Sequence, residues 1–257
     1  MSTGVTVDLI RDAFMIAVTA MLAVRLCLSG LSRRYRSFFL FLILEFARDL
    51  ALLPLNPSGA AYYKVWVLTE PMEWLFYALV VLEIYSLVLA DYRGLYTAGR
   101  WCLMLAVGVS LACAALTLAA PVHSVQQSQL MTYYYVAERA VYFSLAVFLL
   151  TILALLMRYP IVLNRNIIAH SLIFSTYFLV CACSYQLLSA GGFRMIGVVR
   201  LAITLLNVGT LGAWLVALTQ AGEQRRQQLH PSWMPGREEE LVGQLQRLNF
   251  ALQGLIN

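Results

Sequence analysis

Long apolar runs separated by short polar loops fill the first 221 residues of the chain. Each run holds about 20 residues, which is the length of helix that crosses a hydrocarbon layer about 30 Å thick. The runs lie at about 9–30, 36–55, 62–90, 98–120, 130–157, 164–189 and 194–221. The pattern predicts an all-α, polytopic membrane protein in which a seven-transmembrane-helix bundle occupies residues 1–221.

Composition agrees with this class of protein. The chain is 61% hydrophobic and 12% charged, whereas soluble domains are about a quarter charged. Its formal charge of +5 does not predict nucleic-acid binding, because the basic residues stand singly between apolar runs. Five cysteines lie within the apolar runs and three histidines are scattered, so we expect no metal and no cofactor.

Basic residues are distributed unequally between the two sets of loops. One set holds Arg33, Arg34, Arg36, Arg93, Arg100, Arg158, Arg165, Arg225 and Arg226, and the other holds Arg11, Lys64 and Arg194. Because positive residues concentrate in cytoplasmic loops, this asymmetry predicts an outside N-terminus and a cytoplasmic C-terminus. The preference for Arg over Lys and the abundance of Ala and Leu favour a bacterial inner membrane.

The C-terminal segment differs from the rest of the chain. Residues 222–237 contain HPSWMPG, whose prolines and glycine predict a linker. Residues 238–257 carry a heptad-spaced stripe that predicts an amphipathic or coiled-coil helix, formed by Leu241, Leu245, Leu248, Leu252 and Leu255. Three interpretations remain open: a homodimer joined through this stripe, a helix that lies on the membrane or docks under the bundle, and a solvated helix.

The third apolar run carries two carboxylates. Trp66, Glu70, Glu73 and Tyr77 are spaced by 4, 3 and 4 residues, so they share one face of a helix. A carboxylate that faces lipid costs a few kcal/mol, and we therefore expect this face to point inward, with both glutamates in the outer half of the membrane. Pro71 lies between them and predicts a kink.

Three other runs place polar groups at a similar depth, and together with the third-run residues they form the predicted ligand-binding set. These are Glu45, Arg48 and Asp49 in the second run, Tyr134, Tyr135, Glu138 and Arg139 in the fifth, and Arg200, Thr204 and Asn207 in the seventh. Five carboxylates face three guanidiniums, a surplus of two negative charges. Buried surplus charge is costly, so either protons or a bound cation must neutralise it. The aromatic side chains offer cation–π faces to an amine. The alternative is a set of structural ion pairs that hold the helices in register.

Motifs for catalysis are sparse. The string PMEWLFY resembles the proline-x-glutamate-glutamate segment of membrane-bound carotenoid (lycopene) cyclases, in which acidic groups protonate a polyene. The resemblance covers about seven residues and departs at Trp74, where the second acid would stand. Hydrolase, metalloprotease and nucleotide-binding motifs are absent, so we expect no enzyme.

Seven helices with an outside N-terminus resemble rhodopsins and G-protein-coupled receptors in topology alone, because the one lysine, Lys64, lies at a membrane edge and the DRY and NPxxY patterns are missing. The sequence predicts a sensor or receptor-like protein. Its tail of about 36 residues is too short for a signalling domain, so the signal would pass to a separate cytoplasmic partner. The alternatives are a small transporter for protons, cations or amines and a membrane scaffold subunit.

Overall fold

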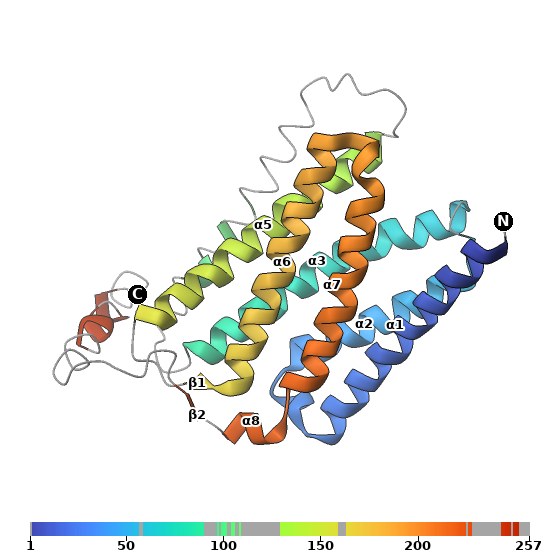
Figure 1. Cartoon of the computed structure of the whole chain (residues 1–257). Coiled ribbons are helices and arrows are strands. Elements are labelled where there is room, and N and C mark those ends of the chain that lie inside the picture. The colour runs from blue at the N-terminus through green and yellow to red at the C-terminus, as the bar shows by residue number, and fades with distance from the viewer. Residues whose placement is uncertain are drawn as a thin grey trace. The chain divides into compact units, whose positions relative to one another are not determined.

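A computed structural model shows a chain that is mostly helical (Figure 1). It describes residues 2–56, 59–89, 97, 99–101, 104–105, 108, 129–158, 163–224, 226–227, 243–247 and 249–251. The long helices are α1 (Ser2–Leu28), α2 (Arg36–Leu52), α3 (Ala60–Val88), α5 (Gln129–Arg158), α6 (Arg165–Gly191) and α7 (Ile196–Ala217). The short elements are η1 (Leu31–Arg33), β1 (Leu163–Asn164), η2 (Gly192–Met195), α8 (Gln220–Gln224) and β2 (Arg226–Gln227).

Four helices are long and apolar enough to cross a membrane. These candidate spans are Ala61–Val88, Val136–Ala154, Arg165–Leu188 and Ile196–Ala217, and each falls within or close to a predicted apolar run. Helices α1 and α2 occupy the first two predicted runs. The predicted run at 98–120 lies almost wholly outside the described residues. The four spans support the prediction of an all-α integral membrane protein.

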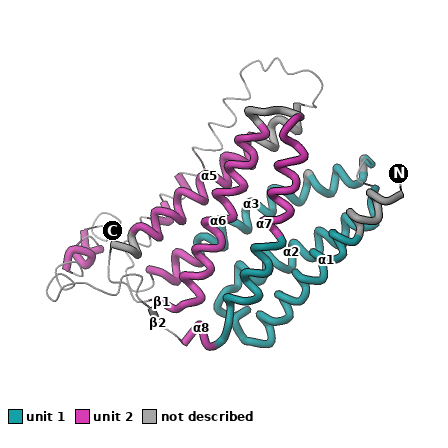
Figure 2. The backbone as a smooth tube through the Cα atoms, viewed as in Figure 1, with its two compact units in different colours: residues 1–83, 208–220 teal, residues 84–207, 221–257 magenta. Residues whose placement is uncertain are grey.

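The chain divides into two compact units, which Figure 2 shows in separate colours. Unit 1 comprises residues 1–83 and 208–220, and unit 2 comprises residues 84–207 and 221–257. Helices α3 and α7 therefore contribute residues to both units. Every contact described below joins residues of the same unit.

Polar contacts tie the helices of unit 1 together at one end of the unit. The Arg25 guanidinium on α1 donates a hydrogen bond to the Leu215 carbonyl in the last turn of α7, where a cation is favoured by the helix dipole. The Glu83 carboxylate on α3 accepts hydrogen bonds from the backbone N–H groups of Ser37 (2.9 Å) and Phe38 (3.2 Å). It thereby satisfies N–H groups in the first turn of α2 that have no partner within their own helix.

Unit 2 is built on the packing of α5 against α6. Leu145 and Leu149 of α5 and Phe174 and Phe178 of α6 are fully buried. His170 of α6 is also fully buried, and its ring contacts Phe174 edge to face with centroids 5.0 Å apart. The apolar surface removed from water and lipid along this helix pair gives the unit its core.

The first residues of the predicted linker are folded. Residues 222–224 complete α8, and residues 226 and 227 form strand β2, which pairs antiparallel with β1. The Glu223 carboxylate accepts hydrogen bonds from the side-chain amides of Asn164 (2.7 Å) and Asn166 (3.1 Å). The chain after α8 is thus fastened to the start of α6 by backbone and side-chain bonds.

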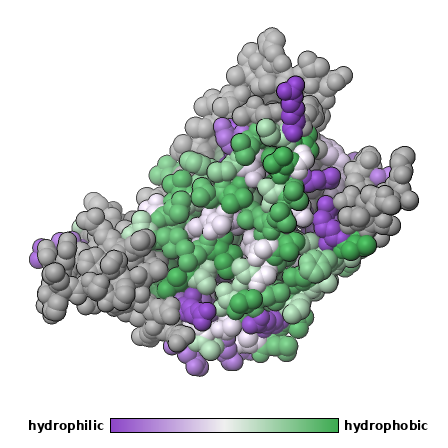
Figure 3. Space-filling view, viewed as in Figure 1, coloured by the Kyte–Doolittle hydropathy of each residue, from purple (hydrophilic) through white to green (hydrophobic). Residues whose placement is uncertain are grey.

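Helix α3 separates a buried polar face from an exposed apolar face. Its exposed residues include Leu68, Met72, Leu75 and Leu79, which are 74%, 46%, 58% and 38% exposed. On the face shown in Figure 3, hydrophobic side chains also cover the middle of the helices. Such a surface suits lipid tails. Helix α3 continues through Pro71, and the predicted kink stays a prediction.

The C-terminal tail is described in part. Residues 243–247 are helical, and Leu245 within them is 3% exposed. Leu245 is thus buried within its own chain, and the three interpretations of the leucine stripe stay predictions. Its other four members, Leu241, Leu248, Leu252 and Leu255, lie outside the described residues.

Candidate functional site

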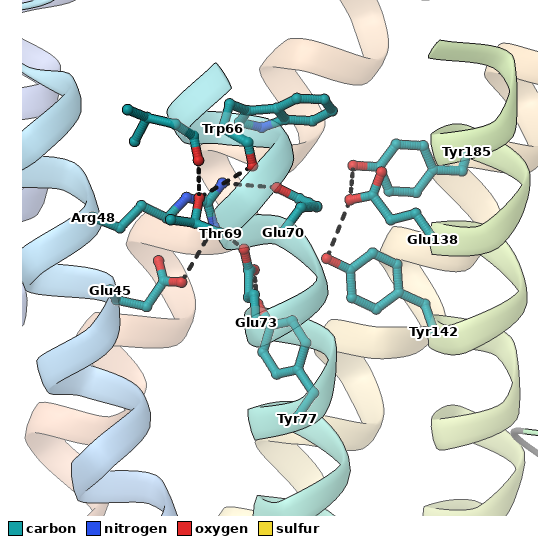
Figure 4. A network of polar contacts seen from close by, with 11 residues as sticks. Glu45, Arg48, Trp66, Thr69, Glu70, Glu73, Tyr77, Glu138, Tyr142 and Tyr185 are labelled. Atoms are coloured by element: carbon teal, nitrogen blue, oxygen red, sulfur yellow. Dashed lines mark hydrogen bonds and ion pairs between the residues drawn. The ribbon is translucent and has the colours of Figure 1, made fainter. Parts of the chain in front are cut away.

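Two helices of unit 1 bring four ionisable side chains into contact (Figure 4). The Arg48 guanidinium on α2 donates from Nη2 to Glu70 Oε2 (3.1 Å) and from Nη1 to Glu73 Oε2. The same Nη1 lies 3.5 Å from Glu45 Oε1. We call Glu45, Arg48, Glu70 and Glu73 the carboxylate cluster. A single guanidinium thus contacts three carboxylates from two helices.

Helical spacing accounts for the arrangement of the cluster. Glu45 and Arg48 are three residues apart on α2, and Glu70, Glu73 and Tyr77 follow one face of α3 at spacings of 3 and 4. Residues at such spacings are neighbours on a helix surface. The Tyr77 hydroxyl donates a 2.7 Å hydrogen bond to Glu73 Oε1, so both oxygens of Glu73 accept a hydrogen bond.

The cluster is shielded from solvent and lipid. The side chains of Glu70 and Glu73 are 4% and 8% exposed, that of Arg48 is 13% exposed and that of Glu45 is 23% exposed. The aromatic ring of Phe41 packs against Tyr77 with centroids 5.0 Å apart. Where water is excluded, the local dielectric constant is low. A low dielectric constant strengthens the attraction within an ion pair and raises the cost of any charge that is left uncompensated.

The formal charges within the cluster do not balance. Three carboxylates and one guanidinium sum to minus two when all four groups are ionised. A surplus of this kind is relieved by protons on the carboxylates or by a cation that binds them. The arrangement can therefore hold protons, a small inorganic cation or an ammonium group.

A second buried carboxylate lies in unit 2. Glu138 on α5 is 4% exposed, and its Oε1 accepts hydrogen bonds from Tyr185 on α6 (2.6 Å) and Tyr142 on α5 (3.4 Å), as Figure 4 shows. The rings of Tyr142 and Tyr185 stack with centroids 5.8 Å apart. We call Glu138, Tyr142 and Tyr185 the tyrosine–carboxylate cluster. The two hydroxyl groups supply hydrogen-bond donors to this buried carboxylate.

The other members of the predicted ligand-binding set are distributed over both units. Arg139 donates to Gln186 Oε1 (3.0 Å). In α7, Arg200 is exposed, Thr204 donates to the Arg200 carbonyl (2.8 Å) and Asn207 is half-buried. In unit 1, Asp49 and Trp66 are half-buried. The side chains of Tyr134 and Tyr135 lie outside the described residues.

Several polar partners escaped the sequence reasoning. Tyr185 and Gln186 of α6 bind Glu138 and Arg139, and Glu83 binds the start of α2. One signal for Tyr185 was available, because Phe178 and Tyr185 are seven residues apart and so share a face of α6. Glu83 had no comparable signal, since the N–H groups of Ser37 and Phe38 that it binds belong to the backbone.

Comparison of the chain with protein-family models, with curated proteins and with solved structures found no significant match. Within the described residues, no three His, Cys, Asp or Glu side chains lie together in a way that could hold a metal ion. The carboxylate cluster is therefore interpreted from its own geometry and charge.

Proposed function

We propose that the protein is a seven-helix membrane sensor or receptor-like protein whose carboxylate cluster binds a small cation: a proton, an inorganic cation or an amine. In this proposal the N-terminus lies outside a bacterial inner membrane and the C-terminus lies in the cytoplasm. The observation that carries the proposal is the sharing of one guanidinium by Glu45, Glu70 and Glu73. A purely structural ion pair needs one carboxylate for each guanidinium, and this cluster has two more.

The position of the cluster suits a switch that responds to cation binding. Arg48 connects α2 to α3, so a cation that competes with the guanidinium for Glu70 or Glu73 would weaken the connection between these two helices. A ligand shifts an equilibrium only through its different affinity for two states. Competition with Arg48 supplies such a difference, and a separate cytoplasmic partner would receive the resulting change.

The proposal is tested with purified protein in uncharged lipid nanodiscs. Tetramethylammonium serves as the probe for an amine and sodium as the probe for an inorganic cation, while a pH indicator dye measures proton release. Binding at a hundredfold excess over Kd should stabilise the protein by about 2.7 kcal/mol in thermal unfolding. The Glu70→Gln/Glu73→Gln variant should lose both the stabilisation and the proton release.

Asp12→Asn is a matched control, because Asp12 is an exposed carboxylate on α1 whose partner is Arg11. It should respond to the probes as the native protein does. If neither probe binds and no proton is released in the native protein, the cluster is a structural ion-pair network and the protein is a scaffold subunit. Cation-driven proton flux across vesicles that contain the protein would instead favour the transporter.

A further inference from the structure

Three exposed arginines lie between the end of α1 and the first residue of α2. Arg33, Arg34 and Arg36 stand within four residues of one another and all three side chains are exposed. We call them the arginine loop. The loop concentrates three guanidinium groups in one short segment, and it takes no part in the carboxylate cluster.

The backbone of the arginine loop is held in place from inside the protein. Gly30 adopts a left-handed conformation (φ 71°) that turns the chain, and the short helix η1 follows. Leu31 and Tyr35, which flank the first two arginines, are 5% and 1% exposed. The Arg36 Nε donates to the Arg33 carbonyl (3.1 Å). A loop anchored in this way presents its guanidiniums outward with little ordering left to complete on binding.

The loop lies level with the ends of two candidate membrane spans in unit 1. Next to the loop, Ser37 and Phe38 donate to Glu83, which stands five residues before the end of the candidate span Ala61–Val88. Arg25, eight residues before Arg33, contacts Leu215, two residues before the end of the candidate span Ile196–Ala217. The ends of two candidate spans therefore mark the level of the loop, which is where lipid phosphates would lie if both spans cross a membrane.

We propose that the arginine loop binds the phosphate groups of anionic phospholipids. Guanidinium and phosphate match in charge and geometry, and a planar guanidinium can bind two phosphate oxygens at once. The Glu83 carboxylate already occupies the first N–H groups of α2, so the phosphate is held by arginine side chains and not by the helix terminus. This inference is independent of the function proposed for the carboxylate cluster.

Native mass spectrometry of the detergent-solubilised protein tests the inference. Titration with phosphatidylglycerol or phosphatidylcholine gives the Kd of the first bound lipid, and phosphatidylglycerol should bind more tightly. Each basic residue near anionic lipid contributes a factor of roughly five in affinity, so Arg33→Gln/Arg36→Gln should weaken phosphatidylglycerol binding about 30-fold. Phosphatidylcholine binding should change little, and Arg33→Lys/Arg36→Lys should keep most of the preference.

Lys64→Gln/Arg194→Gln is the matched control. It removes two positive charges from exposed side chains near the starts of α3 and α7. The other ends of these two helices lie level with the arginine loop, so the control variant should keep the preference for phosphatidylglycerol. Equal binding of the two lipids by the native protein overturns the inference, as does an equal loss in the control variant. Loss of the preference on adding millimolar inorganic phosphate at constant ionic strength would show that the loop takes a soluble anion instead.

Discussion

Replacing Arg48 should destabilise the protein far more than replacing Glu73. Arg48→Met keeps most of the length of the side chain and removes its charge, while Glu73→Gln keeps the shape of the side chain and removes one negative charge. In a simple buried ion pair both changes would break the same interaction. In the carboxylate cluster they have different consequences, because Arg48 serves three carboxylates and Glu73 is one of them.

The magnitudes follow from the contacts. Without Arg48, two nearly buried carboxylates and one less buried carboxylate lose their shared cation, and loss of one partner from a buried pair costs about 3–5 kcal/mol. In Glu73→Gln the guanidinium keeps Glu70 at 3.1 Å and Glu45 at 3.5 Å. The glutamine amide can still bond to Arg48 and to Tyr77, and the formal charge of the cluster falls from minus two to minus one. We expect a cost of at most about 1 kcal/mol, since removal of surplus buried charge offsets the lost attraction.

Equilibrium unfolding in mixed micelles with increasing dodecyl sulfate measures both variants. The free energy of unfolding should fall by about 3–5 kcal/mol for Arg48→Met and by at most about 1 kcal/mol for Glu73→Gln. Adding Glu70→Gln and Glu73→Gln to Arg48→Met should restore part of the loss. Equal losses in the two single variants would refute the reasoning, because they would show that Arg48 and Glu73 form a discrete pair in which the other carboxylates have no share.

Three further predictions concern unit 2. Tyr185→Phe removes the 2.6 Å hydrogen bond to Glu138 and should lower the free energy of unfolding by about 1.5–3 kcal/mol. Tyr142→Phe removes a 3.4 Å hydrogen bond and should lower it by less. The same unfolding titration compares the two variants, and equal losses would contradict the geometry. Glu223→Ala removes the hydrogen bonds to Asn164 and Asn166, so it should speed amide hydrogen exchange in strand β2 without changing the exchange rates in α2. Unchanged exchange in β2 would show that these hydrogen bonds do not hold the strand in place. Because Leu245 is buried within its own chain, Leu245→Asp should make the tail more sensitive to proteases without a change in oligomeric mass. A fall in oligomeric mass would instead favour the homodimer interpretation.

Helices were predictable from the sequence because lipid imposes a simple rule on it. A backbone in hydrocarbon must satisfy its own hydrogen bonds, so a long apolar run is read as a helix. Predicted runs and observed helices agree for α3, α5, α6 and α7, which supply the four candidate spans. The β1–β2 ladder was not predictable, since two residues in each strand carry no periodic pattern. The burial of Leu245 was not predictable either, because it depends on tertiary contacts that a heptad stripe does not specify.

The composition of the carboxylate cluster was partly predictable. Spacing along α2 and α3 identified the faces that carry Glu45, Arg48, Glu70 and Glu73, and depth along each helix placed them in one layer. Spacing could not choose among the available guanidiniums, because that choice depends on which helices are neighbours. Of the three candidate arginines, Arg48 contacts both Glu70 and Glu73.

The charge balance becomes more informative once the partners are known. Counted from the sequence, two surplus negative charges were spread over four helices, where distance could keep them apart. In the structure, Glu45, Glu70 and Glu73 meet at a single guanidinium on α2, so the same surplus of two is concentrated between two helices. Charges that are spread through a bundle can each be tolerated with local hydrogen bonds, but three carboxylates on one guanidinium repel one another at close range. A proton or cation that bound at this cluster would therefore relieve a repulsion that no rearrangement of Arg48 alone can remove.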